Sequence, residues 1–347
     1  MSIGLLAAEL EYNELTGVST LAEVLSSVNY QVVNGHTGHM RPVSTGYMPL
    51  DDVLNGGLRP GDLFILGGPS GVGKTIFSLQ AARNVVFNEQ EAAAMYICYE
   101  HDRAHLLMRL LCMESAALGL GDDALTLRRL NAFMVDASKS LGLLDWLRSD
   151  PRYAPVVANV ERYAPRLHLV KASGSQSTLE QIRLWARRLT ASGRRTLLVV
   201  DYLQKIPVEM STPMQESEVT TYLAQGLKEL AMSAGIRILA VAAADRIGLQ
   251  SKRMRLHDMR GSSAIQYEAD IGAVLNNKFQ IVSREHIVYN PVQAEAMRNW
   301  VVMSIDKNRS GRCGVDLEFQ LDAAHFHLEP RGSYVRDRLI DDRVTLE

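Results

Sequence analysis

The stretch LFILGGPSGVGKT, residues 63–75, decides the fold of this chain. A short apolar run ends in a glycine-rich turn, and a helix is expected from Thr75 to about residue 88. Residues 68–75 match the pattern GxxxxGK[ST], in which backbone N–H groups and a helix N-terminus face a polyphosphate. A glycine turn with an adjacent lysine is the alternative. The predicted nucleotide-binding loop consists of Gly68, Pro69, Ser70, Gly71, Val72, Gly73, Lys74 and Thr75.

Lys74 and Thr75 have separate expected roles in this loop. The ammonium of Lys74 would reach the β- and γ-phosphates, and the hydroxyl of Thr75 would bind Mg²⁺. Such a loop needs a second acidic anchor, and Asp201 ends the apolar run TLLVVD, residues 196–201. At the C-terminal edge of a buried strand its carboxylate would hold Mg²⁺ through water, unless it only caps a following helix. ATP and Mg²⁺ are therefore the expected cofactors.

Glu100 ends a second apolar run, AAMYICYE, at residues 93–100. A carboxylate at that strand end could polarise the attacking water as a general base. An ordinary surface glutamate is the alternative, and the spacing alone leaves the two interpretations open.

Further apolar runs occur at residues 237–246, 271–277 and 301–308, with helical segments at 178–191 and 218–234. Continuous rather than alternating runs are typical of strands that are covered on both faces. We therefore expect an α/β fold with a mostly parallel central sheet flanked by helices. Residues 315–329 predict a terminal β-hairpin.

The composition of the 347 residues bounds the class of protein. Hydrophobic residues make up 47% and charged residues 22%, which is globular usage in a chain long enough for one large or two smaller domains. The formal net charge of −2 excludes a surface that coats nucleic acid all over, so such a contact needs a local patch. The three cysteines form no CxxC pair, which favours a reducing compartment over a zinc site. The sequence shows neither a secretory signal nor a membrane span, so we expect a cytoplasmic protein.

Several stretches, in this order, resemble the RecA-like motor domain of DnaB-type replicative helicases. The resemblance covers about residues 43–330 and implies a RecA-like P-loop NTPase that hydrolyses ATP, translocates on single-stranded DNA and unwinds duplex DNA. Residues 1–42 would be a short helical segment with a linker, and residues 331–347 a charged tail, mobile or partner-facing. The stretches are VSTGYMPLDDVLNGGLRPGDLFILGGPSGVGKT (43–75), ICYEHDRAHLLMRLLC (97–112), VVDYLQ (199–204), MRGSSAIQYEAD (259–270) and SIDKNRSGRCGVDLEF (304–319).

The resemblance also implies roles for single residues. It places Glu100 at the position of the family's catalytic glutamate. It also implies that Lys307 and Arg309 are the lysine and the arginine finger that reach the neighbouring subunit's ATP. A finger that acts in trans requires a head-to-tail interface, which closes into a ring, here a hexamer, or continues as a filament. The alternative for Arg309 is a hairpin arginine paired with a local carboxylate.

The stretch 259–270 is similar to a DNA-contacting loop of the central channel. A basic cluster precedes it, opposed along the sequence only by Asp258, and loops of this kind supply phosphate contacts without sequence preference. A solvated loop is the alternative, and no aromatic residue indicates base stacking. The candidate nucleic-acid residues are Lys252, Arg253, Arg255, Arg260, Gly261 and Ser263.

Some features depart from the family. Ala243 stands where the family has a glutamine that senses the γ-phosphate, and Gly261 replaces an acidic residue. With only about 40 residues before the resembled motor, we expect the family's large N-terminal domain to be missing, and residues 114–166 are longer than the family usually has. These departures favour an alternative, a nucleotide-gated assembly or regulatory ATPase, KaiC-like or loader-like, that acts on a protein partner. A recombinase-like filament is a third possibility. The N-terminal segment could clasp an adjacent subunit or cover its own core.

Overall fold

The computed structural model describes residues 18–136, 141–208, 215–244, 248–282 and 295–340. The chain divides into two compact units, residues 1–41 and 42–347. In the first unit, helix α2 (Leu21–Val33) starts with a capping box between Thr20 and Glu23, and none of its residues is buried. Residues 1–17 of the predicted N-terminal segment and 341–347 of the predicted tail lie outside the described residues.

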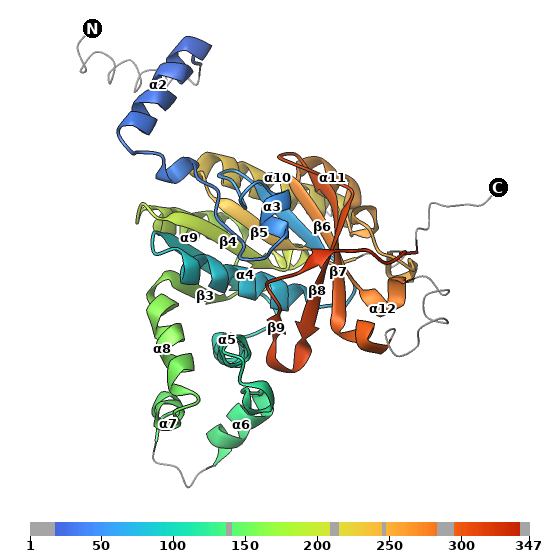
Figure 1. Cartoon of the computed structure of the whole chain (residues 1–347). Coiled ribbons are helices and arrows are strands. Elements are labelled where there is room, and N and C mark those ends of the chain that lie inside the picture. The colour runs from blue at the N-terminus through green and yellow to red at the C-terminus, as the bar shows by residue number, and fades with distance from the viewer. Residues whose placement is uncertain (1–17, 137–140, 209–214, 245–247, 283–294, 341–347) are drawn as a thin grey trace, which may run out of the picture. The chain divides into compact units, whose positions relative to one another are not determined.

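The second unit is built on one sheet (Figure 1). Its described strands are β1 (Leu63–Gly67), β2 (Ala92–Cys98), β3 (Leu167–Lys171), β4 (Arg195–Asp201), β5 (Arg237–Val241), β6 (Ile271–Asn277), β7 (Trp300–Asn308), β8 (Val315–Asp322), β9 (His327–Leu328) and β10 (Ser333–Tyr334). Their order is β10–β8–β7–β6–β1–β5–β4–β2–β3, with β9 also on β8. The neighbouring strands β3, β2, β4, β5, β1 and β6 pair in parallel. Strands β7, β8, β9 and β10 are added antiparallel. The expected mostly parallel sheet and the terminal hairpin are therefore confirmed.

Helices cover both faces of this sheet, because successive side chains of a strand point to opposite sides. Phe64 and Leu66 of β1 belong to a core shared with α4 (Lys74–Asn88), α5 (Arg103–Ala117), α6 (Leu127–Val135), α7 (Leu143–Ser149) and α8 (Ala154–Tyr163). Leu63 and Ile65 belong to the opposite core, with α9 (Leu179–Thr190), α10 (Glu216–Ala234) and α11 (Ser262–Glu268). Two short helices, α3 (Leu50–Val53) and α12 (Lys278–Ile281), complete the unit.

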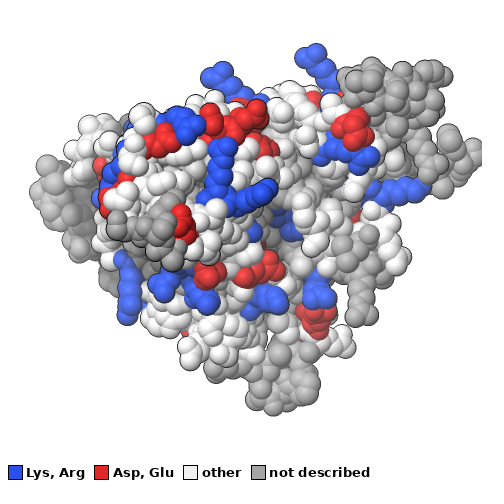
Figure 2. All heavy atoms as spheres, turned by 90° about the horizontal axis from the view of Figure 1, so that it is seen from below, with Lys and Arg blue, Asp and Glu red and all other residues white. Residues whose placement is uncertain are grey.

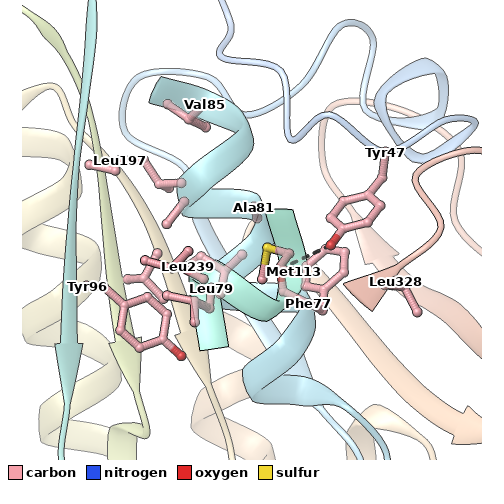
Figure 3. Close-up of a cluster of buried hydrophobic side chains, with 14 of the residues drawn as sticks. Tyr47, Phe77, Leu79, Ala81, Val85, Tyr96, Met113, Leu197, Leu239 and Leu328 are labelled. Carbon is pink, nitrogen blue, oxygen red and sulfur yellow. Dashed lines mark hydrogen bonds between the residues drawn. The ribbon is translucent and has the colours of Figure 1, made fainter. Parts of the chain in front are cut away.

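Helix α4 is held in the middle of the first core (Figure 3). The rings of Tyr47 and Phe77 stack with centroids 4.6 Å apart, and the Tyr47 hydroxyl donates to the Phe77 carbonyl at 3.5 Å. On the same helix Leu79 and Val85 lie in the cluster that Tyr96 of β2 enters from the sheet. This packing fixes the helix whose first residues are Lys74 and Thr75.

Two features differ from the sequence-based expectation. Strand β3 was missed, because its alternation of half-buried and exposed residues, typical of a sheet edge, contains no continuous apolar run. The described part of the predicted tail, residues 331–340, forms backbone hydrogen bonds with the rest of the chain, and a partner-facing role for it stays a prediction. Ser333–Tyr334 pair with β8, and the N–H of Ile340 donates to the carbonyl of Ile281 at 2.7 Å. Backbone hydrogen bonds to β8 and to Ile281 hold this segment despite its polar composition.

Within the described ranges, no helix combines the length and the apolar character that crossing a membrane requires.

Candidate functional site

The predicted phosphate loop lies between β1 and α4, as its motif requires. Gly68 and Gly73 have φ of +143° and +105°, values that favour glycine. A Cβ at Gly68 would lie 2.5 Å from the carbonyl oxygen of Leu275, so no larger residue fits there. The ammonium of Lys74 donates to the carbonyls of Gly68 and Pro69 at 2.7 and 2.8 Å. Burial lowers the pKa of Lys74, and the charges of Asp201 and Glu100 oppose that shift.

The acidic anchor meets the loop directly. Asp201 is 2% exposed, and its carboxylate accepts hydrogen bonds from the Thr75 hydroxyl and the Tyr96 hydroxyl, each at 2.8 Å. Burial raises the pKa of Asp201, and these two hydrogen bonds act in the opposite direction. The pairing of β2 with β4 places Cys98 opposite Asp201, so Glu100, two residues further on, emerges at the same edge.

These side chains line one cavity of about 490 Å³, which is in the range of small-ligand sites. Mg²⁺ prefers oxygen ligands and commonly takes one or two protein oxygens beside substrate phosphates and water. The Thr75 hydroxyl and the Asp201 carboxylate fit that ion, and the loop with Lys74 fits a polyphosphate. The lining residues include Gly68, Ser70, Gly71, Gly73, Lys74, Thr75, Glu100, His101, Arg109, Asp201, Ala243 and Phe326.

Sequence analysis missed several residues of this cavity. Arg109 donates from Nε to Nε2 of His105 and from Nη2 to Nε2 of His101, both at 3.0 Å. Its guanidinium lies 4.9 Å from the centroid of the Phe326 ring. The spacing of four residues from His101 to His105 to Arg109 could have indicated a shared face. Phe326 comes from beyond β8 and has no local pattern that links it to the site.

Tyr96 is a further missed residue. Its hydroxyl lies 2.9 Å from that of Ser78 and bonds to Asp201, yet in the sequence it is one apolar-run residue among several. Only the pairing of β2 with β4 shows that this ring carries a polar group to the anchor.

Lys307 and Arg309 lie together near the start of β1, whereas the phosphate loop follows its end. The ammonium of Lys307 donates to the carbonyls of Gln266 and Tyr267, the latter at 3.1 Å. The guanidinium of Arg309 donates to the Tyr267 carbonyl at 2.6 Å and to the carboxylate of Asp270 at 3.1 Å. The alternative of an arginine paired with a local carboxylate therefore describes Arg309 within the single chain.

The position of Arg309 separates it from its own phosphate loop. The other carboxylate oxygen of Asp270 accepts from the N–H of Leu63 at 2.8 Å, so Arg309 lies beside the start of β1. The loop begins after the end of β1, which at 3.3 Å per residue is on the order of 15 Å away. Within one chain these groups are therefore not brought together.

The predicted nucleic-acid residues fall into two groups, arginines held in ion pairs and residues without such a pair among the described contacts. Along the sequence Asp258 opposes the basic cluster, and the fold adds three further acids. Arg253 is 5% exposed and pairs with Asp316, Arg255 pairs with Asp306 at 2.9 Å, and Arg260 pairs with Glu216 at 2.6 Å. These acids lie far away in the sequence and reach the cluster only in the folded chain.

The remaining candidates are accessible. Lys252 and Ser263 are exposed, and Gly261 is the left-handed N-cap of α11 with φ of +71°. Among the described residues of the face drawn in Figure 2, Lys and Arg are interspersed with Asp and Glu. A nucleic-acid contact would therefore use a small patch, as the net charge of −2 indicates.

Comparison with known proteins agrees with this geometry. The model of the DnaB-like helicase C terminal domain matches residues 42–132 and 148–328. The chain belongs to this family. Residues 133–147, which include the end of α6 and the start of α7, are the gap in the match. The chain is 27% identical over 316 residues to the replicative DNA helicase DnaB of Rickettsia bellii, covering 85% of this chain and 58% of that protein.

Other relatives agree with this family membership. The replicative DNA helicase DnaB of Geobacillus stearothermophilus is 27% identical over 249 residues, covering 71% of this chain and 50% of that protein. The chain thus spans 50–58% of the length of these two relatives.

Solved structures share the fold. One solved ATPase domain superposes with a TM-score of 0.70 at 19% identity, covering 90% of this chain and 99% of that one. A DnaB-like replicative helicase, described with its interactions with primase, superposes with a TM-score of 0.66 at 18% identity. The match covers 94% of this chain and 71% of that one.

Proposed function

We propose that this chain is the motor of a DnaB-like helicase, which hydrolyses ATP to translocate on single-stranded DNA and unwind duplex DNA. The observation that carries the proposal is the convergence of Lys74, Thr75, Asp201 and Glu100 on one cavity in a chain of this family. Because the chain spans 50–58% of the length of two relatives, the activity of a complete helicase is part of this proposal.

In the proposed reaction each side chain has one task. Lys74 exchanges the carbonyls of Gly68 and Pro69 for phosphate oxygens, and Thr75 and Asp201 hold Mg²⁺. An Mg²⁺ ion held there would supply positive charge against the negative charge that develops on the phosphates. Glu100, exposed at the cavity edge, orients and polarises the attacking water.

The placement of Lys307 and Arg309 supports the proposal of a ring. Because they lie beside the start of β1, they can complete a site only on a neighbouring copy. A head-to-tail arrangement of this kind closes into a ring, which we propose to be a hexamer. The arginine would then stabilise charge on the γ-phosphate in trans.

Single-stranded DNA is the proposed polymer along which the motor moves. Its contacts would come from Lys252, Gly261 and Ser263. Arg260 would join them once its ion pair with Glu216 opens. The ion pairs of Arg253 and Arg255 favour the second candidate function, a nucleotide-gated assembly ATPase acting on a protein partner, because paired arginines release few counterions from DNA.

The deciding experiment measures the steady-state ATPase rate with and without single-stranded DNA across a salt series. Strong stimulation that declines steeply with salt supports the translocating motor, because phosphate contacts weaken as counterions are added. ATP turnover that ignores DNA at every salt concentration contradicts it and favours the assembly ATPase.

A further inference from the structure

One side-chain amide joins three segments between the nucleotide cavity and the start of α11. Gln204 lies in a short 3₁₀ turn, Leu203–Lys205, three positions after the anchor Asp201. Its amide oxygen accepts from the N–H of Ala243 at 3.0 Å. Its amide nitrogen lies 3.4 Å from the carbonyls of both Ala243 and Arg260. The ends of β4 and β5 and the residue before the α11 cap thus meet at one group.

The two sides of this junction face different parts of the molecule. Ala243 lines the nucleotide cavity, two residues past the end of β5. Arg260 precedes Gly261, the N-cap of α11, and its N–H donates to the Ala243 carbonyl at 3.1 Å. A displacement of the β5 end therefore reaches Arg260 through a shared carbonyl and a shared amide.

The segment at Gly261 has little freedom on its other side. A Cβ built at Gly261 would lie 2.5 Å from Thr220 of α10, so the backbone there is closely packed. The position of Arg260 is thus determined by α10 on one side and by the Gln204–Ala243 junction on the other.

The chemistry of the junction requires an amide. Gln204 must accept from one N–H and donate toward two carbonyls, and an uncharged amide has both functions. A carboxylate of the same size would accept but not donate, and a hydrocarbon would do neither.

We propose that Gln204 is a positioning residue that transmits the state of the nucleotide cavity to the proposed DNA-contacting segment at Arg260. This inference rests on the proposed function. None of these hydrogen bonds joins Gln204 to the phosphate loop or to the Mg²⁺ ligands, so its role is coupling rather than catalysis.

The test compares Gln204→Leu and Gln204→Glu with the wild-type chain, with Gln176→Leu at an exposed position as the matched control. The measured quantities are the KM for ATP, the basal kcat and the ratio of kcat with and without saturating single-stranded DNA. We expect the Gln204 variants to keep KM and basal kcat within about two-fold while the stimulation ratio falls about five-fold or more. Gln176→Leu should behave as wild type.

Two outcomes overturn the coupling. In the first, single-stranded DNA stimulates the wild type, and both Gln204 variants show the same ratio of kcat with and without DNA as the wild type. The other is a fall of basal kcat in step with the stimulated rate in the size-preserving Gln204→Glu, which would indicate a structural role. A wild type that DNA does not stimulate overturns the proposed function, and the coupling with it.

Discussion

Lys74 is the residue on which nucleotide chemistry depends most directly. Its ammonium donates hydrogen bonds to the carbonyls of Gly68 and Pro69 in the phosphate loop. We predict that Lys74→Ala lowers ATP turnover by about a hundred-fold or more, as does removal of a single preorganised donor elsewhere. Steady-state ATPase assays and binding of a fluorescent ATP analogue measure this change.

The exposed Lys171 on β3 provides the control, since Lys171→Ala leaves the cavity intact. Full ATP turnover in Lys74→Ala would contradict the phosphate-site assignment.

The histidines beside Arg109 predict a pH effect. Burial, with the charge of Arg109, lowers the pKa of both His101 and His105 below the ordinary value of about 6.5. Both rings accept from Arg109 at Nε2, so only rings with an unprotonated Nε2 can hold it. As the pH falls through the lowered pKa values, protonation releases Arg109 into a site that also contains Glu100.

We therefore expect ATPase activity to fall as the pH drops below about 6.5, and to fall less in the double variant His101→Gln, His105→Gln. The free energy of unfolding should decrease over the same interval, because protonation costs more in the folded than in the unfolded chain. Parallel pH profiles of wild type and variant would contradict this role of the histidines.

At the scale of elements, helix α5 is joined to α4 by a buried ion pair. Arg83 and Glu114 form two hydrogen bonds of 2.5 and 2.6 Å with side chains 12% and 0% exposed, and the guanidinium lies 3.9 Å from the Phe87 ring centroid. Removing one partner leaves an uncompensated buried charge.

We predict that Glu114→Ala lowers the free energy of unfolding by about 3–5 kcal/mol, measured by urea denaturation. Replacing both partners, as in Arg83→Met with Glu114→Leu, should restore most of that loss. Glu161→Ala, which breaks the exposed pair with Arg148, should cost less than about 1 kcal/mol. Equal losses in Glu114→Ala and Glu161→Ala would contradict the importance of burial.

Helix α11 connects features that the proposed mechanism needs to link. Its N-cap, Gly261, follows the Gln204 junction, and carbonyls in its last turn, at Gln266 and Tyr267, hold Lys307 and Arg309. Because α11 has seven residues and rises about 1.5 Å per residue, the Gln204 junction and the two cations lie at the two ends of one short helix.

At the scale of the whole molecule, the proposed catalytic role of Arg309 requires assembly, because Arg309 lies beside the start of β1 and away from its own phosphate loop. We predict that Arg309→Ala keeps ATP binding but lowers turnover by about a thousand-fold. Arg312→Ala on the same turn is the matched control. Mixing Arg309→Ala with Glu100→Gln subunits should restore part of the turnover, because an interface between the two variants contains one intact glutamate and one intact arginine.

Turnover in Arg309→Ala near the wild-type rate would contradict the trans role. The absence of any gain on mixing, in subunits shown by size measurement to co-assemble, would do the same.

The sequence alone determined the phosphate loop, the anchor Asp201, the continuous buried strands and the family, because these depend on contiguous residues whose spacing carries their chemistry. It also placed Glu100 at a strand end. Only the tertiary structure decided what the basic cluster does. Asp316 is 63 positions from Arg253, and the antiparallel addition of β7 and β8 brings it within reach.

The same reason applies to the junction at Gln204, to the contact of Phe326 with Arg109 and to the hydrogen bond between Ile340 and Ile281. Each joins segments distant in the chain, and no local period or composition records such a contact. Burial then decides which charges remain available: Arg253 is withdrawn into an ion pair, whereas Lys252 next to it stays exposed.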